Sequence, residues 1–216
     1  MESASIFLLA SIFNLAAARI YTGFTYGAFW SEQANVKRYA DFYHSFELAK
    51  NLTNTPVQSD SARLYTCITT KDDPTEAFQA AIDTGTNLLL GMWVSLGVIN
   101  QSNEVQVDNE LAALGKDFDK YGQSLADLVI GLSVGNEDVY RFTAKKDGQS
   151  GVGPDDVRLT TQKVRGKIKA APWGRFMEGK PIGYTDTSPY AVMSDSDSIG
   201  MTAYPYWERN FIGWCC

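Results

Sequence analysis

Residues 128–141 read LVIGLSVGNEDVYR, an apolar run that ends abruptly in an amide and a carboxylic acid. The run begins with three apolar residues that do not alternate with polar ones, which is typical of a parallel strand covered on both faces. Asn136 and Glu137 follow this strand directly. Because residues at the carboxyl ends of barrel strands line a shared mouth, we expect both side chains to face a substrate. A capped strand-to-helix turn is the alternative interpretation of the same spacing.

Short apolar segments also occur before and after this stretch, and residues with helical periodicity lie between them. The segments span residues 23–30, 62–67, 87–94, 181–185 and 199–203. In one intervening segment, apolar residues are spaced four, three, four and three apart, which places them on one face of a helix that stops before Gly122. These residues are Val107, Leu111, Leu114, Phe118 and Tyr121. Strands that alternate with helices predict an α/β fold with a parallel sheet.

Two α/β architectures fit this alternation: an open doubly wound sheet, and a (β/α)8 TIM barrel of which about six of eight strands are present. The first strand is not followed by a Gly-x-Gly-x-x-Gly loop, and Gly151-Val152-Gly153 lies too far from a strand end to replace it. This absence argues against a nicotinamide-dependent oxidoreductase.

Composition limits the function further. The chain has 216 residues, enough for one substantial core, and a formal net charge of -6, which disfavours binding to nucleic acid. His44 is the single histidine, so neither a metal cluster nor a Ser-His-Asp triad is expected. Cys67, Cys215 and Cys216 do not have the spacing of a disulfide framework or a zinc site.

The N-terminal segment has features of an export signal. The apolar run from Ile6 to Ala18 is too short to span a bilayer and ends in the small residues Ala16-Ala17-Ala18. We expect residues 1–18 to be a signal peptide and the protein to be secreted, either extracellular or in a cell wall; a buried N-terminal helix is the alternative. The sequons Asn51-Leu52-Thr53 and Asn100-Gln101-Ser102 are compatible with a secreted glycoprotein. No later segment predicts a membrane span.

Six motifs occur in order at the expected strands. They are Gly23-Phe24-Thr25-Tyr26-Gly27-Ala28, Ser61-Ala62-Arg63-Leu64-Tyr65, Leu88-Leu89-Leu90-Gly91-Met92-Trp93, Val134-Gly135-Asn136-Glu137-Asp138, Pro181-Ile182-Gly183-Tyr184-Thr185-Asp186-Thr187 and Met201-Thr202-Ala203-Tyr204-Pro205-Tyr206. Together they resemble the strands of fungal members of glycoside hydrolase family 17, the endo-1,3-β-glucanases of cell walls. The resemblance covers residues 23 to about 208.

The resemblance implies a retaining mechanism with two glutamates roughly 5 Å apart. Glu137 matches the family's acid/base residue. The family's nucleophile lies in a Glu-Thr-Gly-Trp-Pro segment, which this sequence does not contain. We therefore expect a partial barrel over residues 19–208, a divergent tail over residues 209–216, and a chain that is truncated relative to the family.

The expected substrate is β-1,3-glucan, with no cofactor and no metal. The residues expected to bind it are Asn136, Tyr26, Arg63, Tyr204 and Tyr206, although each aromatic residue is equally explained by packing. A glucan-binding remnant without activity is the alternative to a glycoside hydrolase. The sequence indicates no particular oligomeric state.

Overall fold

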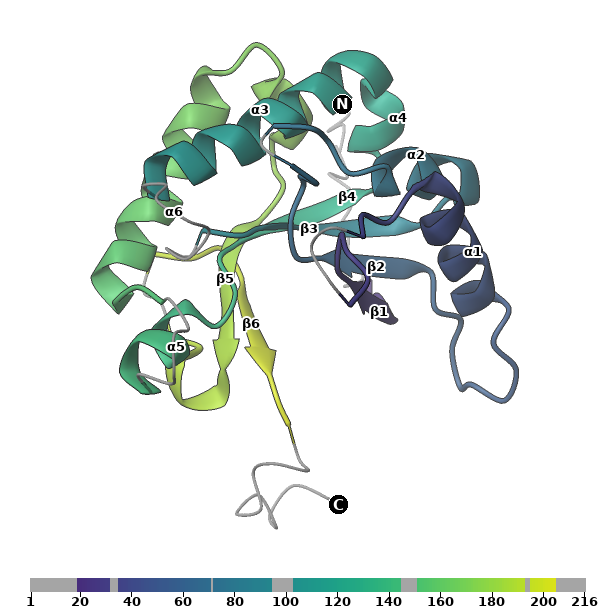
Figure 1. Ribbon diagram of the computed structural model, residues 1–216, viewed down its shortest axis with the longest axis horizontal. Helices are drawn as coiled ribbons and strands as arrows, with labels where there is room; N and C mark the ends of the chain where they lie inside the picture. The colour runs from purple at the N-terminus through teal and green to yellow at the C-terminus, as the bar shows by residue number, and fades with distance from the viewer. Residues whose placement is uncertain are drawn as a thin grey trace, which may run out of the picture.

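The computed structural model describes residues 19–31, 35–70, 72–94, 103–144, 151–192 and 195–204. Within these residues, six strands form one sheet that curls into half of a barrel (Figure 1). The strands are β1 (Gly23–Tyr26), β2 (Ser61–Leu64), β3 (Asn87–Met92), β4 (Val129–Val134), β5 (Ile182–Thr187) and β6 (Ile199–Thr202). The expected signal peptide, residues 1–18, and the expected divergent tail, residues 209–216, lie outside the described residues, so both stay predictions.

Helices connect the strands and cover the convex face of the sheet in Figure 1. They are α1 (Tyr39–Lys50), α2 (Ala77–Thr84), α3 (Asn103–Tyr121), α4 (Gln123–Ala126), α5 (Asp138–Ala144) and α6 (Pro154–Ala170), with short 3-10 helices η1 (Gly174–Met177) and η2 (Ser188–Tyr190). The predicted stop at Gly122 is confirmed, because α3 ends at Tyr121 and Gly122 has a φ of 52°.

The strand order decides between the two architectures. The strands lie in the order β1-β2-β3-β4-β5-β6, each parallel to its neighbour, so the order in space equals the order in the chain. A doubly wound sheet requires a point at which this order reverses. No reversal occurs among the described strands, and the prediction of an incomplete (β/α)8 barrel is confirmed.

The main core lies between the sheet and the helices. Strand residues such as Leu88, Leu90 and Leu132 are fully buried there against helix residues such as Phe78 and Phe118. Close contact between strands requires glycine at several positions, including Gly91, where a Cβ would lie 2.0 Å from the backbone oxygen of Leu64. Each additional side-chain atom at that point would push β2 and β3 apart.

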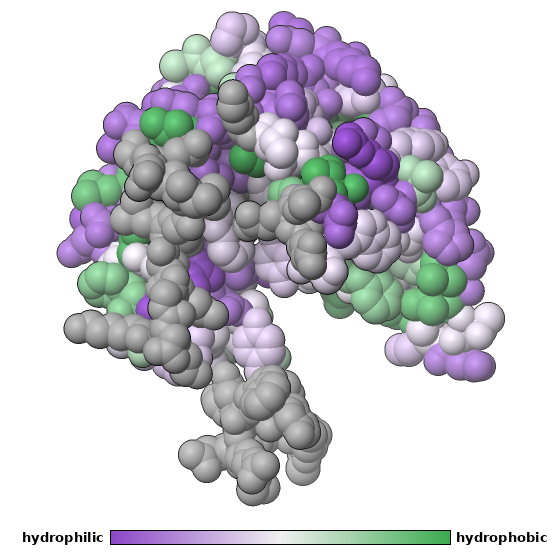
Figure 2. Space-filling model, in the orientation of Figure 1, coloured by the Kyte–Doolittle hydropathy of each residue, from purple (hydrophilic) through white to green (hydrophobic). Residues whose placement is uncertain are grey.

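The other face of the sheet is concave, and the molecule has the outline of an arch over a hollow (Figure 2). Apolar side chains are exposed at both edges of the arch, with Phe24 of β1 47% exposed and Met201 of β6 62% exposed. These two strands are the edges of the described sheet. In the part of the chain that the structure describes, no helix has both the length and the hydropathy of a membrane span.

Candidate active site

The turn that follows β4 has an unusual backbone. Gly135 has a φ of 88° and Glu137 a φ of 57°, a conformation that side-chain-bearing residues rarely adopt. The Asp138 carboxylate fixes the turn by accepting a hydrogen bond from the Asn136 amide at 2.8 Å. A Cβ on Gly135 would lie 2.4 Å from the same carboxylate, so glycine is required there. Such strain is typical of functional sites, because only the surrounding contacts maintain it.

The first turn of α5 is fixed from β5 by a buried tyrosine and a buried aspartate. The Tyr184 hydroxyl accepts hydrogen bonds from the amides of Asp138 and Val139, both at 3.0 Å, and donates to the Asp186 carboxylate. Asp186 has no exposed surface and also accepts from Val139 and Thr187 amides at 3.0 and 2.7 Å. Burial, followed by the bond to Asp186, raises the pKa of Tyr184. These contacts bury Asp186 against the first turn of α5.

The Glu137 carboxylate is half-buried and meets two hydroxyl groups from the end of β6. Thr202 donates to Oε1 of Glu137 at 2.7 Å, and Tyr204 donates to the same oxygen at 2.6 Å. The bond to Glu137 and partial burial raise the pKa of Tyr204 to about 12. Oε2 of Glu137 has no hydrogen-bond partner among the described residues.

A guanidinium group lies beside this carboxylate. Nη2 of Arg63, on β2, donates to Oδ1 of Asn136 at 2.7 Å, which leaves Nδ2 of Asn136 to donate elsewhere. The Arg63 guanidinium also lies over the Tyr65 ring at 5.3 Å, and its buried Nε has no partner among the described residues. Burial lowers the pKa of Arg63, while the nearby Tyr65 and Glu137 act in the opposite direction.

A buried carboxyl group links the ends of β2 and β3 behind the site. Glu110 of α3 accepts hydrogen bonds from the amide of Cys67 at 2.7 Å and from the amide of Trp93 at 3.0 Å. It is fully buried, and burial raises its pKa to about 7 despite these bonds. The Trp93 ring packs against the Arg141 guanidinium at 4.8 Å, next to the turn that carries Glu137. Glu110 therefore fixes two strand ends at the mouth.

The structure brings together four of the residues predicted from the sequence: Glu137, Asn136, Arg63 and Tyr204. Tyr26 lies apart from them, because its ring packs edge-on against Phe46 of α1 at a centroid distance of 5.0 Å, on the helix-covered face.

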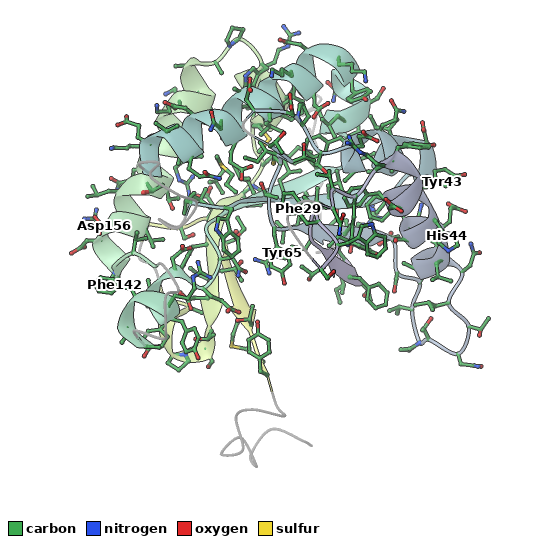
Figure 3. All side chains as sticks on the ribbon, viewed as in Figure 1. Phe29, Tyr43, His44, Tyr65, Phe142 and Asp156 are labelled. Atoms are coloured by element: carbon green, nitrogen blue, oxygen red, sulfur yellow. The ribbon has the colours of Figure 1, made fainter. Side chains whose placement is uncertain are left out.

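Three further residues can be compared between the sequence analysis and the structure. Tyr206 lies outside the described residues and stays a prediction. His44 is exposed on α1 (Figure 3). Sequence reasoning missed Thr202, although it shares one face of the chain with Tyr204 through the period of two residues that strands follow.

The described side chains were searched for groups that could bind a metal ion. Within the described ranges, no group of three or more His, Cys, Asp or Glu residues is placed to hold a metal ion. The cluster around Glu137 supplies a carboxylic acid, an amide, a guanidinium group and two hydroxyl groups. One carboxylic acid and several hydrogen-bond donors at a strand mouth fit a neutral polyhydroxyl substrate and proton transfer to it.

Comparison with known proteins gives a consistent set of relatives. The chain is 41% identical to "Probable glucan endo-1,3-beta-glucosidase eglC" of Aspergillus oryzae, over 94% of this chain and 44% of the relative. It is 38% identical to the protein of the same name from Aspergillus terreus, over 94% of this chain and 42% of the relative, and 37% identical to that of Emericella nidulans, over 94% and 43%.

The chain thus spans less than half the length of the relatives it matches. No protein-family model matches it. The identity to these proteins extends over nearly the whole chain and agrees with the six strand motifs and with the half-barrel. Over nearly its whole length, the chain is therefore similar to part of the Aspergillus and Emericella proteins named glucan endo-1,3-beta-glucosidases.

Proposed function

We propose that this chain is part of a retaining endo-1,3-β-glucanase, a glycoside hydrolase in which Glu137 is the general acid and base. The observation that carries the proposal is the position of Glu137: a half-buried carboxyl group at the carboxyl end of β4, next to an amide and a guanidinium group. The names of the relatives supply the substrate and the bond, an internal β-1,3-glucosidic linkage.

The hydrogen bonds of Glu137 suggest which oxygen transfers the proton. Oε1 accepts from Thr202 and Tyr204, so the acidic proton resides on Oε2. As the glycosidic bond breaks, Oε2 protonates the leaving oxygen, and in the second step the same oxygen takes a proton from the attacking water. Nδ2 of Asn136 donates to a sugar hydroxyl, because Arg63 occupies its Oδ1.

The first step of retention also needs a nucleophilic carboxylate. The sequence contains no Glu-Thr-Gly-Trp-Pro segment. Asp186 is a poor substitute, because it is fully buried and its oxygens accept hydrogen bonds from Tyr184 and from backbone amides. We therefore expect hydrolysis only when a second carboxylate is supplied on the opposite side of the mouth.

An extended chain tests this mechanism. The 216-residue chain would be joined to the remaining portion of the Aspergillus oryzae relative and assayed for reducing ends released from linear β-1,3-glucan. In that protein, Glu137→Gln should lower kcat by about 10²–10⁴-fold with little change in KM, since only proton transfer is lost. Glu104→Gln, on the exposed surface of α3, is the control. Unchanged hydrolysis in Glu137→Gln would remove Glu137 from this role.

A glucan-binding protein without turnover is the second candidate, and the missing nucleophile segment favours it for the 216-residue chain alone. This chain should bind β-1,3-glucan and release no reducing ends. Release of reducing ends that depends on Glu137 would instead show that another residue serves as nucleophile.

We also propose that the protein is secreted into the extracellular space or the cell wall, on the basis of the apolar segment that ends at Ala18. Expression of the chain in a fungal host should yield a protein in the medium whose N-terminus is Arg19. A product retained in the cells with residues 1–18 attached would contradict this proposal.

A further inference from the structure

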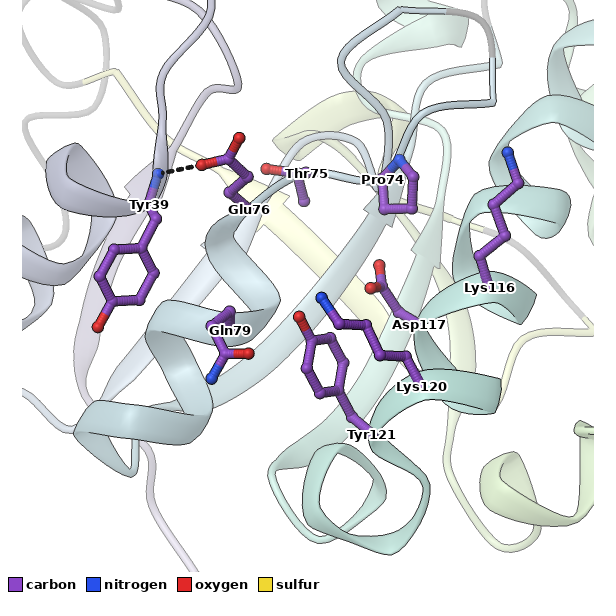
Figure 4. Close-up of a pocket in the computed structure, with 9 residues that line it drawn as sticks. All are labelled: Tyr39, Pro74, Thr75, Glu76, Gln79, Lys116, Asp117, Lys120 and Tyr121. Atoms are coloured by element: carbon purple, nitrogen blue, oxygen red, sulfur yellow. Dashed lines mark hydrogen bonds between the residues drawn. The ribbon is translucent and has the colours of Figure 1, made fainter.

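A second polar pocket lies in the helical layer, apart from the strand mouth (Figure 4). Its volume is about 440 Å³, and none of its lining residues belongs to a strand. It lies among the start of α1, the first turn of α2 and the last turns of α3, and its lining includes Tyr39, Glu76, Gln79, Lys116, Asp117, Lys120 and Tyr121. Glu137 and its hydroxyl partners do not line this pocket.

The unusual group in this pocket is the Asp117 carboxylate. Asp117 is only 6% exposed, and its Oδ2 has no hydrogen-bond partner among the described residues. A buried carboxylate without a partner is costly to the fold, and native proteins nearly always satisfy such atoms with water or a ligand. Figure 4 shows the Asp117 carboxyl group directed toward Pro74.

Three of the neighbouring polar groups are already paired within the protein. Glu76 accepts from the Tyr39 amide at 2.6 Å and from Arg38 at 3.2 Å, and Lys116 pairs with Asp72 at 2.6 Å. Nε2 of Gln79 donates to Asp83 at 2.9 Å. Asp117 is therefore the polar group that most needs a donor from outside the protein.

The charges and surfaces of the pocket indicate the class of ligand. Two ammonium groups, of Lys116 and Lys120, face two carboxyl groups, of Glu76 and Asp117, so neither an anion nor a cation is favoured overall. Tyr121 and Pro74 add apolar surface. A neutral ring with hydroxyl groups on its rim and an apolar face matches this combination, and a pyranose is such a ring.

We propose that this pocket is a second carbohydrate-binding site, in which a sugar hydroxyl donates to Oδ2 of Asp117 and the sugar ring lies against Tyr121. The assignment of a pyranose comes from the pocket itself, whereas the choice of a β-1,3-linked glucan rests on the proposed function. Such a site holds a polysaccharide on the outer surface of the half-barrel while another part of it reaches the mouth.

The test is a titration of the 216-residue chain with laminaritriose, a trimer of β-1,3-linked glucose, followed by NMR of the tyrosine rings. The Tyr121 signal should shift. Asp117→Leu should weaken the affinity measured at Tyr121 by about tenfold or more, since it removes the acceptor without leaving a buried charge. Asp117→Asn should retain most of the affinity, because the amide oxygen still accepts. Asp119→Ala, exposed on the same helix, is the matched control and should have no effect.

Each outcome separates this site from the proposed active site. No shift at Tyr121, a shift that Asp117→Leu leaves unchanged, or a stronger response to inorganic phosphate than to the trisaccharide would overturn the carbohydrate site. Hydrolysis by the extended chain would stand in all three cases. Conversely, a Tyr121 response that depends on Asp117 supports this pocket even if Glu137→Gln leaves hydrolysis unchanged.

Discussion

Thr202 Oγ1 lies 2.7 Å from Oε1 of Glu137, which joins the end of the sixth strand to the turn that follows the fourth. The Tyr204 hydroxyl meets the same oxygen at 2.6 Å. The two hydroxyl groups therefore occupy one carboxylate oxygen, and the other has no hydrogen-bond partner among the described residues. Because the two segments are 65 residues apart in sequence, this contact exists only when the sheet has curled.

The tyrosine of this pair should report on the carboxylate. The pKa of Tyr204 is raised to about 12, with the hydrogen bond to Glu137 as its largest cause. Glu137→Gln should lower this pKa toward the ordinary value near 10, because the neutral amide no longer favours the protonated phenol. The Tyr204 ring carbon can be followed by NMR during a pH titration and assigned with Tyr204→Phe. An unchanged pKa in Glu137→Gln would contradict the contact; Glu104→Gln is the control.

Arg63→Met should destabilise the fold by about 1–3 kcal/mol, because it leaves Oδ1 of the buried Asn136 without a donor. Urea unfolding measures this loss. Arg38→Met is the matched control: its ion pair with Glu76 is exposed, so the expected change is below about 1 kcal/mol. In a double-mutant cycle, Asn136→Ala should remove most of the effect of Arg63→Met, and additive effects would show that the two side chains do not interact.

Two glycines should respond to alanine in opposite directions. Gly91→Ala should cost about 3 kcal/mol or more, because its Cβ would overlap the backbone oxygen of Leu64 between two central strands. Gly166→Ala should stabilise the protein by about 0.5–1 kcal/mol, since it lies within α6 with no atom near the added methyl group. Thermal unfolding of the two variants measures both effects. A stable Gly91→Ala variant would mean that β2 and β3 are not paired as described.

The buried Glu110 predicts a loss of stability as the pH rises. Its pKa is near 4.5 when exposed and about 7 in the folded protein, because burial disfavours the charged form. Its contribution is therefore fully present below about pH 4.5 and is lost as the pH rises through 7. Glu110→Gln should lose stability at low pH, because its amide cannot accept from every donor that faces Glu110, but its unfolding free energy should depend less on pH between 5 and 8. A wild-type stability that rises over this range, with no difference in the variant, would contradict the assignment.

The exposed apolar residues at the edges of the sheet predict self-association. Ile199 is 44% exposed and Met201 62%, both on β6. An edge strand with apolar side chains and unpaired backbone groups favours pairing with another chain. Met201→Lys should raise the monomer fraction of the 216-residue chain in sedimentation velocity, whereas Leu48→Lys, on the exposed face of α1, should not. A wild-type chain that is entirely monomeric at high concentration would refute the prediction.

Much of the fold could be predicted from local pattern. The spacing of Val157, Val164 and Ile168 in the sequence predicts one buried helix face, and all three are buried in α6. A glycine at position 85 is typical of a helix end, and Gly85 ends α2 with a φ of 63°. In the sequence, Asp73-Pro74-Thr75-Glu76 has the pattern of an N-cap followed by a first-turn proline, which predicts a helix start at Asp73. This prediction is wrong: α2 begins at Ala77, because Pro74 forms a β-bridge with Ile68. That bridge depends on a contact with the preceding strand segment, which helix-capping rules do not include.

The site could be predicted only in part, because its residues come from different strands and are brought together only when the sheet forms. The strand-end motif predicted Glu137 and Asn136 as a pair, and the structure places the also predicted Arg63 and Tyr204 in contact with them. The face of Tyr26 could not be predicted, since shifting a strand boundary by one residue moves a side chain from one face to the other. The role of Thr202 depends on how far the sheet curls, and no local pattern encodes that curvature.

The sequential order of the strands has a consequence for biosynthesis. Since each strand pairs with the one made just before it, every strand-helix unit can dock onto its predecessor as the ribosome releases it. Glu137 is made well before its hydroxyl partners, Thr202 and Tyr204. The contacts around Glu137 therefore form only after residue 204 has been made, and nascent chains arrested before that point contain the glutamate without its partners.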